Sequence, residues 1–95
     1  MFQSISIENF INYYSTFEKY RDSTSNHEII DEFKNNGEVW TDKSCTSRAQ
    51  KGKKIFKERL ELDALRYIIN SANKVPEKIR IKAQEIYSSI QKLDL

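Results

Sequence analysis

The sequence predicts an all-α protein with a three-helix core and a fourth helix near the C-terminus. Apolar side chains recur every three or four residues in four separate segments, which is the spacing of a buried helix face. The 95 residues include two glycines and one proline, too few for the many tight turns of an all-β sandwich or barrel. Aromatic residues make up 12% of the chain, which argues against disorder. We therefore expect residues 1–95 to form a single helical domain.

The first helix is predicted over residues 7–20, with Ser6 as its N-cap. The polar residues 20–26 that follow read as a loop. The apolar residues that define the helical spacing are Ile7, Phe10, Ile11, Tyr14 and Phe17.

The second helix is predicted to begin at a capping box formed by Ser25 and Glu28 and to end near Asn36. Its buried face would consist of Ile29, Ile30 and Phe33. Gly37 is well placed as the residue that terminates the helix in a left-handed conformation. The single tryptophan, Trp40, lies in the short connection that follows, and we expect it to fill the core between helices.

The third helix is expected to begin between Ser44 and Arg48 and to continue to about Ala72. Gly52 lowers helix propensity by about 1 kcal/mol relative to Ala, so fraying or a kink is expected near it. Pro76 suits the first turn of a fourth helix over residues 76–94. The apolar stripe of that helix has heptad-like spacing, and packing on the protein's own core is favoured over a dimer seam. The stripe consists of Ile79, Ala83, Ile86, Ile90 and Leu93.

Positive charge is concentrated in residues 43–59. Seven basic residues and one acidic residue give this segment a formal charge of +6, whereas the whole chain carries +2. Residues 1–42 carry −5 and residues 60–95 carry +1. Such segregation is typical of a surface that binds a polyanion.

On a helix, this segment would bury apolar residues on one side and present its cations on the other. An α-helix fits the major groove of B-DNA, where lysines meet phosphates while arginine and glutamine can read base edges. Arg48 and Gln50 lie near the helix start and are the base-reading candidates. The predicted nucleic-acid-binding residues are Lys43, Arg48, Gln50, Lys51, Lys53, Lys54, Lys57 and Arg59.

Three other interpretations of the basic segment stay open. It can be a solvated helix face, or it can bind an acidic protein partner. A membrane surface is disfavoured, because the large apolar residues that would face lipid are needed for the core.

The order of these features resembles a Myb-like trihelical domain: three helices, a tryptophan just after the second, and a basic third helix. The runs YYSTFEKYRDSTSNHEIIDEFKNNGEVW and FKERLELDALRYI resemble one fungal family more specifically. It comprises the DNA-binding domain of the yeast glycolytic-gene activator and the osmostress and filamentation regulators related to it. The resemblance covers residues 6–72, which would form the DNA-binding core, although Phe17 and Thr41 stand where the family usually has Trp and a basic residue.

The resemblance implies sequence-specific binding of double-stranded DNA in a fungal nucleus, as part of a transcription or DNA-maintenance factor. The alternative is a small interaction or inhibitor protein, for example from a phage, whose basic helix binds an acidic protein partner in the cytoplasm. A 95-residue chain that begins at Met favours this second hypothesis.

The residues do not predict an enzyme, a metal site or a cofactor. Cys45, the single cysteine, and His27, the single histidine, are not brought together by any pattern that would make a nucleophile and its base. One cysteine excludes an intramolecular disulfide and indicates a reducing compartment. The chain has neither a secretory signal nor an apolar run that could cross a membrane, so we expect a soluble intracellular protein.

Overall fold

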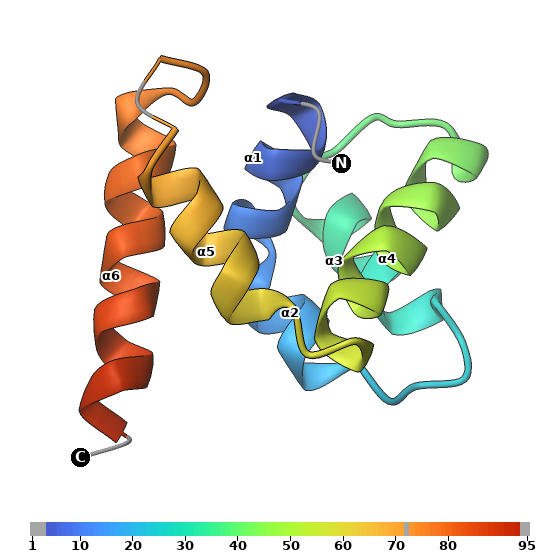
Figure 1. Ribbon diagram of the computed structural model, residues 1–95. Helices are drawn as coiled ribbons and strands as arrows, with labels where there is room; N and C mark the ends of the chain where they lie inside the picture. Colours follow the sequence, from blue (N-terminus) through green and yellow to red (C-terminus); the bar gives the residue numbers. More distant parts are fainter. Residues whose placement is uncertain (1–3, 72, 94–95) are drawn as a thin grey trace. The chain divides into compact units, whose positions relative to one another are not determined.

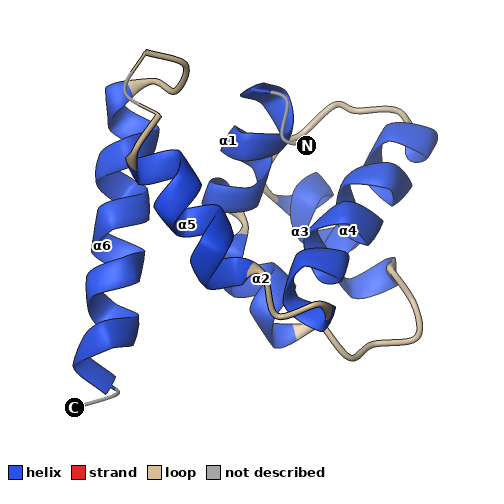
Figure 2. Ribbon diagram, viewed as in Figure 1, coloured by secondary structure: helices blue, strands red, loops and turns tan. Residues whose placement is uncertain are grey.

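The computed structural model describes residues 4–71 and 73–93, and within these ranges it contains six helices and no strand (Figures 1 and 2). The prediction of an all-α fold is confirmed. The chain forms two compact units. We call Tyr13–Arg59 the central unit, and Met1–Asn12 together with Leu60–Leu95 the terminal unit.

The terminal unit contains α1 (Ser4–Asn12), α5 (Glu61–Ile69) and α6 (Glu77–Leu93). Helix α6 packs along α5 and also contacts α1. The Nε of Arg80 on α6 donates a hydrogen bond to the carbonyl of Ile69 at the end of α5, at 3.1 Å. The buried apolar residues of this unit are Ile7, Phe10, Ile11, Ala64, Leu65, Ile68, Val75, Ile79 and Ala83.

The central unit contains α2 (Tyr14–Lys19), α3 (His27–Asn35) and α4 (Asp42–Lys57). Helix α4 packs against both α2 and α3, so it is the element that joins the unit together. The ring of Phe33 on α3 is fully buried and meets three other rings edge-on, at centroid distances between 4.7 and 6.2 Å. Those rings belong to Tyr13, Phe17 and Trp40.

The expected first helix over residues 7–20 is two helices, because the chain leaves helical geometry at Tyr13. The apolar stripe continues through the break, but α1 belongs to the terminal unit and α2 to the central unit. Ser6 lies inside α1 rather than before it, since this helix begins at Ser4. The Tyr13 side chain is buried against Phe33, and this burial raises the pKa of the Tyr13 hydroxyl. The break therefore places an aromatic ring in the core of the central unit.

Helix α3 ends at Asn35, and Gly37 takes the predicted C′ position with φ of 88°. The amide of Gly37 donates to the carbonyl of Lys34 and that of Glu38 to the carbonyl of Phe33, which is the Schellman arrangement. The predicted capping box does not form. Ser25 Oγ accepts from the amide of His27 at 3.0 Å, whereas Glu28 accepts from the hydroxyl of Ser23. Both predicted capping side chains therefore have other hydrogen-bond partners, so the reciprocal bonds of a capping box are absent.

The expectation of one long third helix up to Ala72 is wrong at both ends. Helix α4 begins at Asp42, because Thr41 Oγ1 accepts from the amide of Ser44 at 3.1 Å and caps it. It ends at Lys57, because Arg59 adopts a left-handed conformation with φ of 58°. Helix α5 begins after Leu60, which is 42% exposed. The chain therefore turns from the central to the terminal unit at residues 58–60.

The fourth helix appears as α6, and residue 94 lies outside the described residues. Ile79 and Ala83 are buried within the chain, whereas Ile86 and Ile90 are half-buried. The first half of the heptad-like stripe therefore packs inside the protein, whereas Ile86 and Ile90 stay partly accessible; the side chain of Leu93 is not described by the structure.

Gly52 does not interrupt α4, which is continuous through it. A Cβ at this position would lie 2.5 Å from three ring atoms of Phe17 on α2. Real Cβ contacts are not this short, so glycine lets the α4 backbone rest directly on a fully buried aromatic ring. This residue permits close packing of α4 against α2, and its low helix propensity is the cost.

We expect Gly52→Ala to lower the free energy of unfolding by about 1–3 kcal/mol, because the clash with Phe17 outweighs the better helix propensity of alanine. The matched control is Lys51→Ala on the exposed neighbour, which should change stability by less than about 0.5 kcal/mol. Urea denaturation of the three proteins measures this. Equal or higher stability of Gly52→Ala would contradict the close approach of α4 to Phe17.

Candidate nucleic-acid interface

Helix α4 has one buried face and one exposed, basic face. The buried face carries Cys45, Ala49, Gly52 and Phe56, which recur at helical spacing. The opposite face exposes Lys43, Gln50, Lys51, Lys54 and Lys57, and the exposed Arg59 follows directly after the helix. We call these six residues the basic face.

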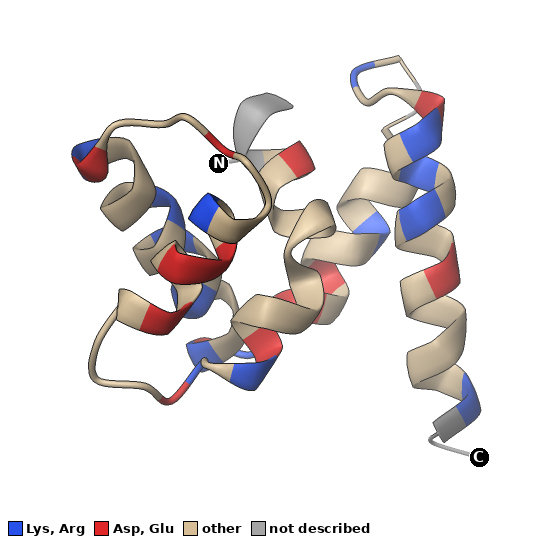
Figure 3. Ribbon diagram, turned by 180° about the vertical axis from the view of Figure 1, so that it is seen from behind, with Lys and Arg blue, Asp and Glu red and all other residues tan. Residues whose placement is uncertain are grey.

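The positive charge of the basic face is not neutralised by neighbouring carboxylates. None of the ion pairs among the described residues includes Lys43, Lys51, Lys54 or Lys57. The central unit contains eight acidic residues, which are red in Figure 3; Asp42 and Glu58 lie at the two ends of α4, and three lie on α3. One of them, Asp31, pairs with His27 at 3.0 Å on the same helix. The exposed lysines of the basic face therefore repel one another and are available to an external anion.

Lys53 was predicted to bind nucleic acid together with the other cations of this segment, but it is not part of the basic face. It is 7% exposed, and its Nζ donates to the carbonyls of Ser23 and Ser25 at 2.9 and 3.3 Å. The side chain anchors the loop between α2 and α3 to α4. The sequence held a signal for this position, because Lys53 follows Ala49 by four residues and Cys45 by eight, on the buried stripe.

Arg48 lies at the edge of the basic face and is half-buried. Its Cζ is 4.0 Å from the centroid of the Trp40 ring, and its Nε donates to Ser44 Oγ at 3.1 Å. Trp40 is itself half-buried and meets Phe33 edge-on. Trp40 therefore lies at the edge of the core, whereas it was expected to fill the core between helices. The sequence offered no signal for the contact between Arg48 and Trp40, which are eight residues apart across a helix start.

The two residues considered as a catalytic pair have other partners. The Cys45 thiol is buried and points at the carbonyl of Trp40 at 3.8 Å. His27 is exposed and pairs with Asp31. Across residues 4–71 and 73–93 no group of three or more His, Cys, Asp and Glu side chains is placed to hold a metal ion. No helix in the described part of the chain has the length and apolar character needed to span a bilayer.

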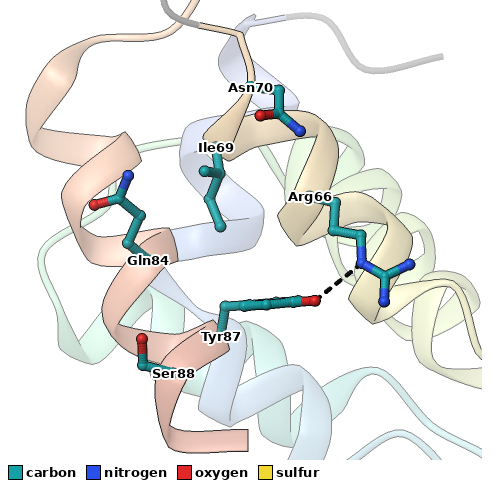
Figure 4. Close-up of a pocket in the computed structure, with 6 residues that line it drawn as sticks. All are labelled: Arg66, Ile69, Asn70, Gln84, Tyr87 and Ser88. Carbon is teal, nitrogen blue, oxygen red and sulfur yellow. Dashed lines mark hydrogen bonds between the residues drawn. The ribbon is translucent and has the colours of Figure 1, made fainter. Parts of the chain in front are cut away.

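A groove of about 410 Å³ lies between α5 and α6 in the terminal unit (Figure 4). Asn70 and Gln84 carry amide groups at its rim, and the Tyr87 ring and Ile69 line it between them. Arg66 Nε donates to the Tyr87 hydroxyl at 3.0 Å, and this bond raises the pKa of the Arg66 guanidinium. The groove is open, and Nη1 of Arg66 pairs with Asp63 Oδ1 at 3.8 Å, so the groove offers less to an anion than the basic face does.

No protein-family model, curated protein or solved structure matches this chain. The function must therefore be inferred from the geometry and charge of α4.

Lys53 and Lys54 form a matched pair, since they are adjacent but face opposite environments. We expect Lys53→Met to lower the free energy of unfolding by about 1–3 kcal/mol, because two loop carbonyls lose a charged donor. Lys54→Met keeps the same stem on the exposed side and should change stability by less than about 0.5 kcal/mol. Thermal or denaturant unfolding compares the two variants. If both lose equal stability, Lys53 does not anchor the loop.

Proposed function

We propose that this protein binds double-stranded DNA through the basic face of α4. The observation that carries the proposal is the exposed row of lysines that no carboxylate neutralises among the described residues. A polyanion removes the mutual repulsion of such a row, and the displaced counterions favour the complex. Most DNA contacts of this kind go to phosphates.

The length and the composition of α4 suit the major groove. Its 16 residues span about 24 Å, and a groove about 12 Å wide admits one helix. Gln50 lies midway along the exposed side between Lys43 and Lys57, which supports a role for its amide at a base edge while the lysines contact the phosphates of the two strands. We propose Gln50 as the residue of the basic face that contributes sequence preference.

The order of elements also supports the proposal. Helix α3, a six-residue connection containing Gly37, and then a basic helix follow the order of helix-turn-helix proteins, in which the second helix reads DNA. The same order underlies the Myb-like resemblance, from which we propose a role in fungal transcription or DNA maintenance in the nucleus.

An acidic protein is the second candidate partner, and Val39 is the observation that favours it. Its side chain is 95% exposed, directly before Trp40 and close in sequence to the basic face. An exposed apolar residue beside cations is typical of a protein interface with an apolar centre and a charged rim. Both candidates use α4, but only duplex DNA predicts a salt dependence set by the number of phosphate contacts.

We expect the double variant Lys54→Glu, Lys57→Glu to lose duplex binding at about 150 mM salt, because two phosphate contacts become repulsive. The control is Lys74→Glu, Lys78→Glu, which makes the same change in net charge on exposed lysines of the terminal unit and should bind like the parent protein. Fluorescence anisotropy with random-sequence duplexes measures the affinity.

The salt dependence gives an independent readout in the same assay. If Lys43, Lys51, Lys54 and Lys57 contact phosphates, the plot of log affinity against log salt should have a slope of about −3 to −4. Equal loss in both double variants would indicate a general effect of net charge. A flat salt response of the parent protein would contradict DNA binding and favour the acidic protein partner.

A further inference from the structure

We propose that Trp40, Ser44 and Arg48 form a preorganised clamp for one phosphate of the DNA backbone. This inference rests on the proposed function and adds a defined subsite at the edge of the basic face. We call the three residues the Arg48 clamp.

The aromatic base of the clamp is held by the core of the central unit. The Trp40 ring meets Phe33 at 5.2 Å and Tyr13 at 6.4 Å between centroids, both edge-on. The Phe33 and Tyr13 side chains are buried. The backbone carbonyl of Trp40 also accepts a hydrogen bond from the Cys45 thiol at 3.8 Å. These contacts leave the ring little freedom to move when a ligand binds.

The guanidinium of Arg48 is held in two directions. Stacking on Trp40, at 4.0 Å from Cζ to the ring centroid, sets the height of the group above the ring. The hydrogen bond from Nε to Ser44 Oγ, at 3.1 Å, sets its rotation. By contrast, no hydrogen bond or ion pair among the described residues restrains the Nζ of Lys51 or Lys54 on the same helix. Of these three cations, Arg48 is the one whose orientation is set by contacts within the protein.

The N–H donors of Arg48 that are not used within the protein suit a phosphate ligand. A guanidinium has five N–H donors, and the bond to Ser44 uses the one on Nε. The four donors on the two terminal nitrogens have no acceptor among the described residues, and they lie in one plane as a fork. Such a fork binds two oxygens of one phosphate in a bidentate manner, which a lysine cannot do. Binding a phosphate costs little conformational entropy here, because the Arg48 side chain is already held in position.

The position of Arg48 on α4 favours a phosphate over a base. Arg48 lies about 120° around the helix from Lys54, at the border between the exposed and the buried faces. The centre of the exposed face is the part that a groove-bound helix turns toward base edges, and its flank meets the backbone of a strand. Lys51, three residues after Arg48, lies on the same flank and supplies a second positive charge.

The test compares three substitutions that leave the net charge unchanged. Arg48→Lys should weaken duplex binding by about tenfold, equally for duplexes of different sequence, because the bidentate fork is lost. Arg21→Lys, the same substitution at an exposed arginine outside the basic face, should change affinity by less than about twofold. Ser44→Ala, which keeps both Arg48 and Trp40, should weaken binding by about threefold because the fork loses its rotational restraint.

The fluorescence of Trp40 provides a readout that a structural role would not move. Trp40 is the single tryptophan in the chain, so its emission reports on this subsite alone. We expect the emission to change when the parent protein binds a duplex, and this change to be lost in Arg48→Lys at saturating DNA. Thermal melting of each variant confirms that the comparison is made on folded protein.

The outcomes separate this inference from the proposed function. If the parent protein binds duplexes but Arg48→Lys binds equally well with the same change of emission, the Arg48 clamp is wrong and DNA binding stands. If the loss appears only for duplexes with guanine at one position, Arg48 reads a base and the phosphate assignment is wrong. If the parent protein does not bind duplexes, both proposals fall.

Discussion

The contact between Gly52 and the ring of Phe17 determines how α4 sits in the central unit. Because the backbone of α4 rests on a buried ring at this point, the helix cannot rotate about its axis without either a clash or a void. In this orientation of α4, Ala49 and Phe56 are buried and Lys54 is exposed. A residue without a side chain thereby decides which charges of α4 reach the surface.

The same rotation explains why two adjacent lysines differ. Lys53 turns inward and uses its ammonium to hold the carbonyls of a loop, so its charge is compensated by hydrogen bonds within the fold. Lys54 turns outward and has no such partner among the described residues. Burial of one cation therefore supports the loop between α2 and α3, while the remaining cations are left for an external ligand. Core packing and the candidate interface share one helix and depend on one orientation.

Sequence patterns anticipated the parts of the structure that have strong local chemistry. The end of α3 just before Gly37 followed from a residue that tolerates positive φ, and the all-α fold followed from apolar spacing and scarce turn residues. The end of α4 was missed because Arg59 adopts a left-handed conformation without glycine or asparagine to mark it. The break at Tyr13 was missed because the apolar stripe runs through it, although α1 and α2 belong to different units.

The candidate site was predicted as a set of cations, and its internal organisation was not. Charge counting identifies the segment, but it cannot show that Lys53 is occupied by a loop or that Arg48 lies over Trp40. The first contact joins α4 to a loop 28–30 residues earlier in the chain, and the second joins α4 to a residue before the start of the helix, so both follow from tertiary packing. The positions of Lys43, Gln50 and Lys57 on the exposed side agree with helical periodicity alone.

Backbone amide chemical shifts, followed while a duplex is titrated into isotope-labelled protein at about 150 mM salt, test the role of α4 most directly. We expect the largest shifts at Lys43, Gln50 and Lys54 and at the indole N–H of Trp40, with α6 unaffected. Shifts concentrated on α5 and α6, or no shifts at all with DNA in excess, would contradict the assignment of α4 as the DNA-binding helix.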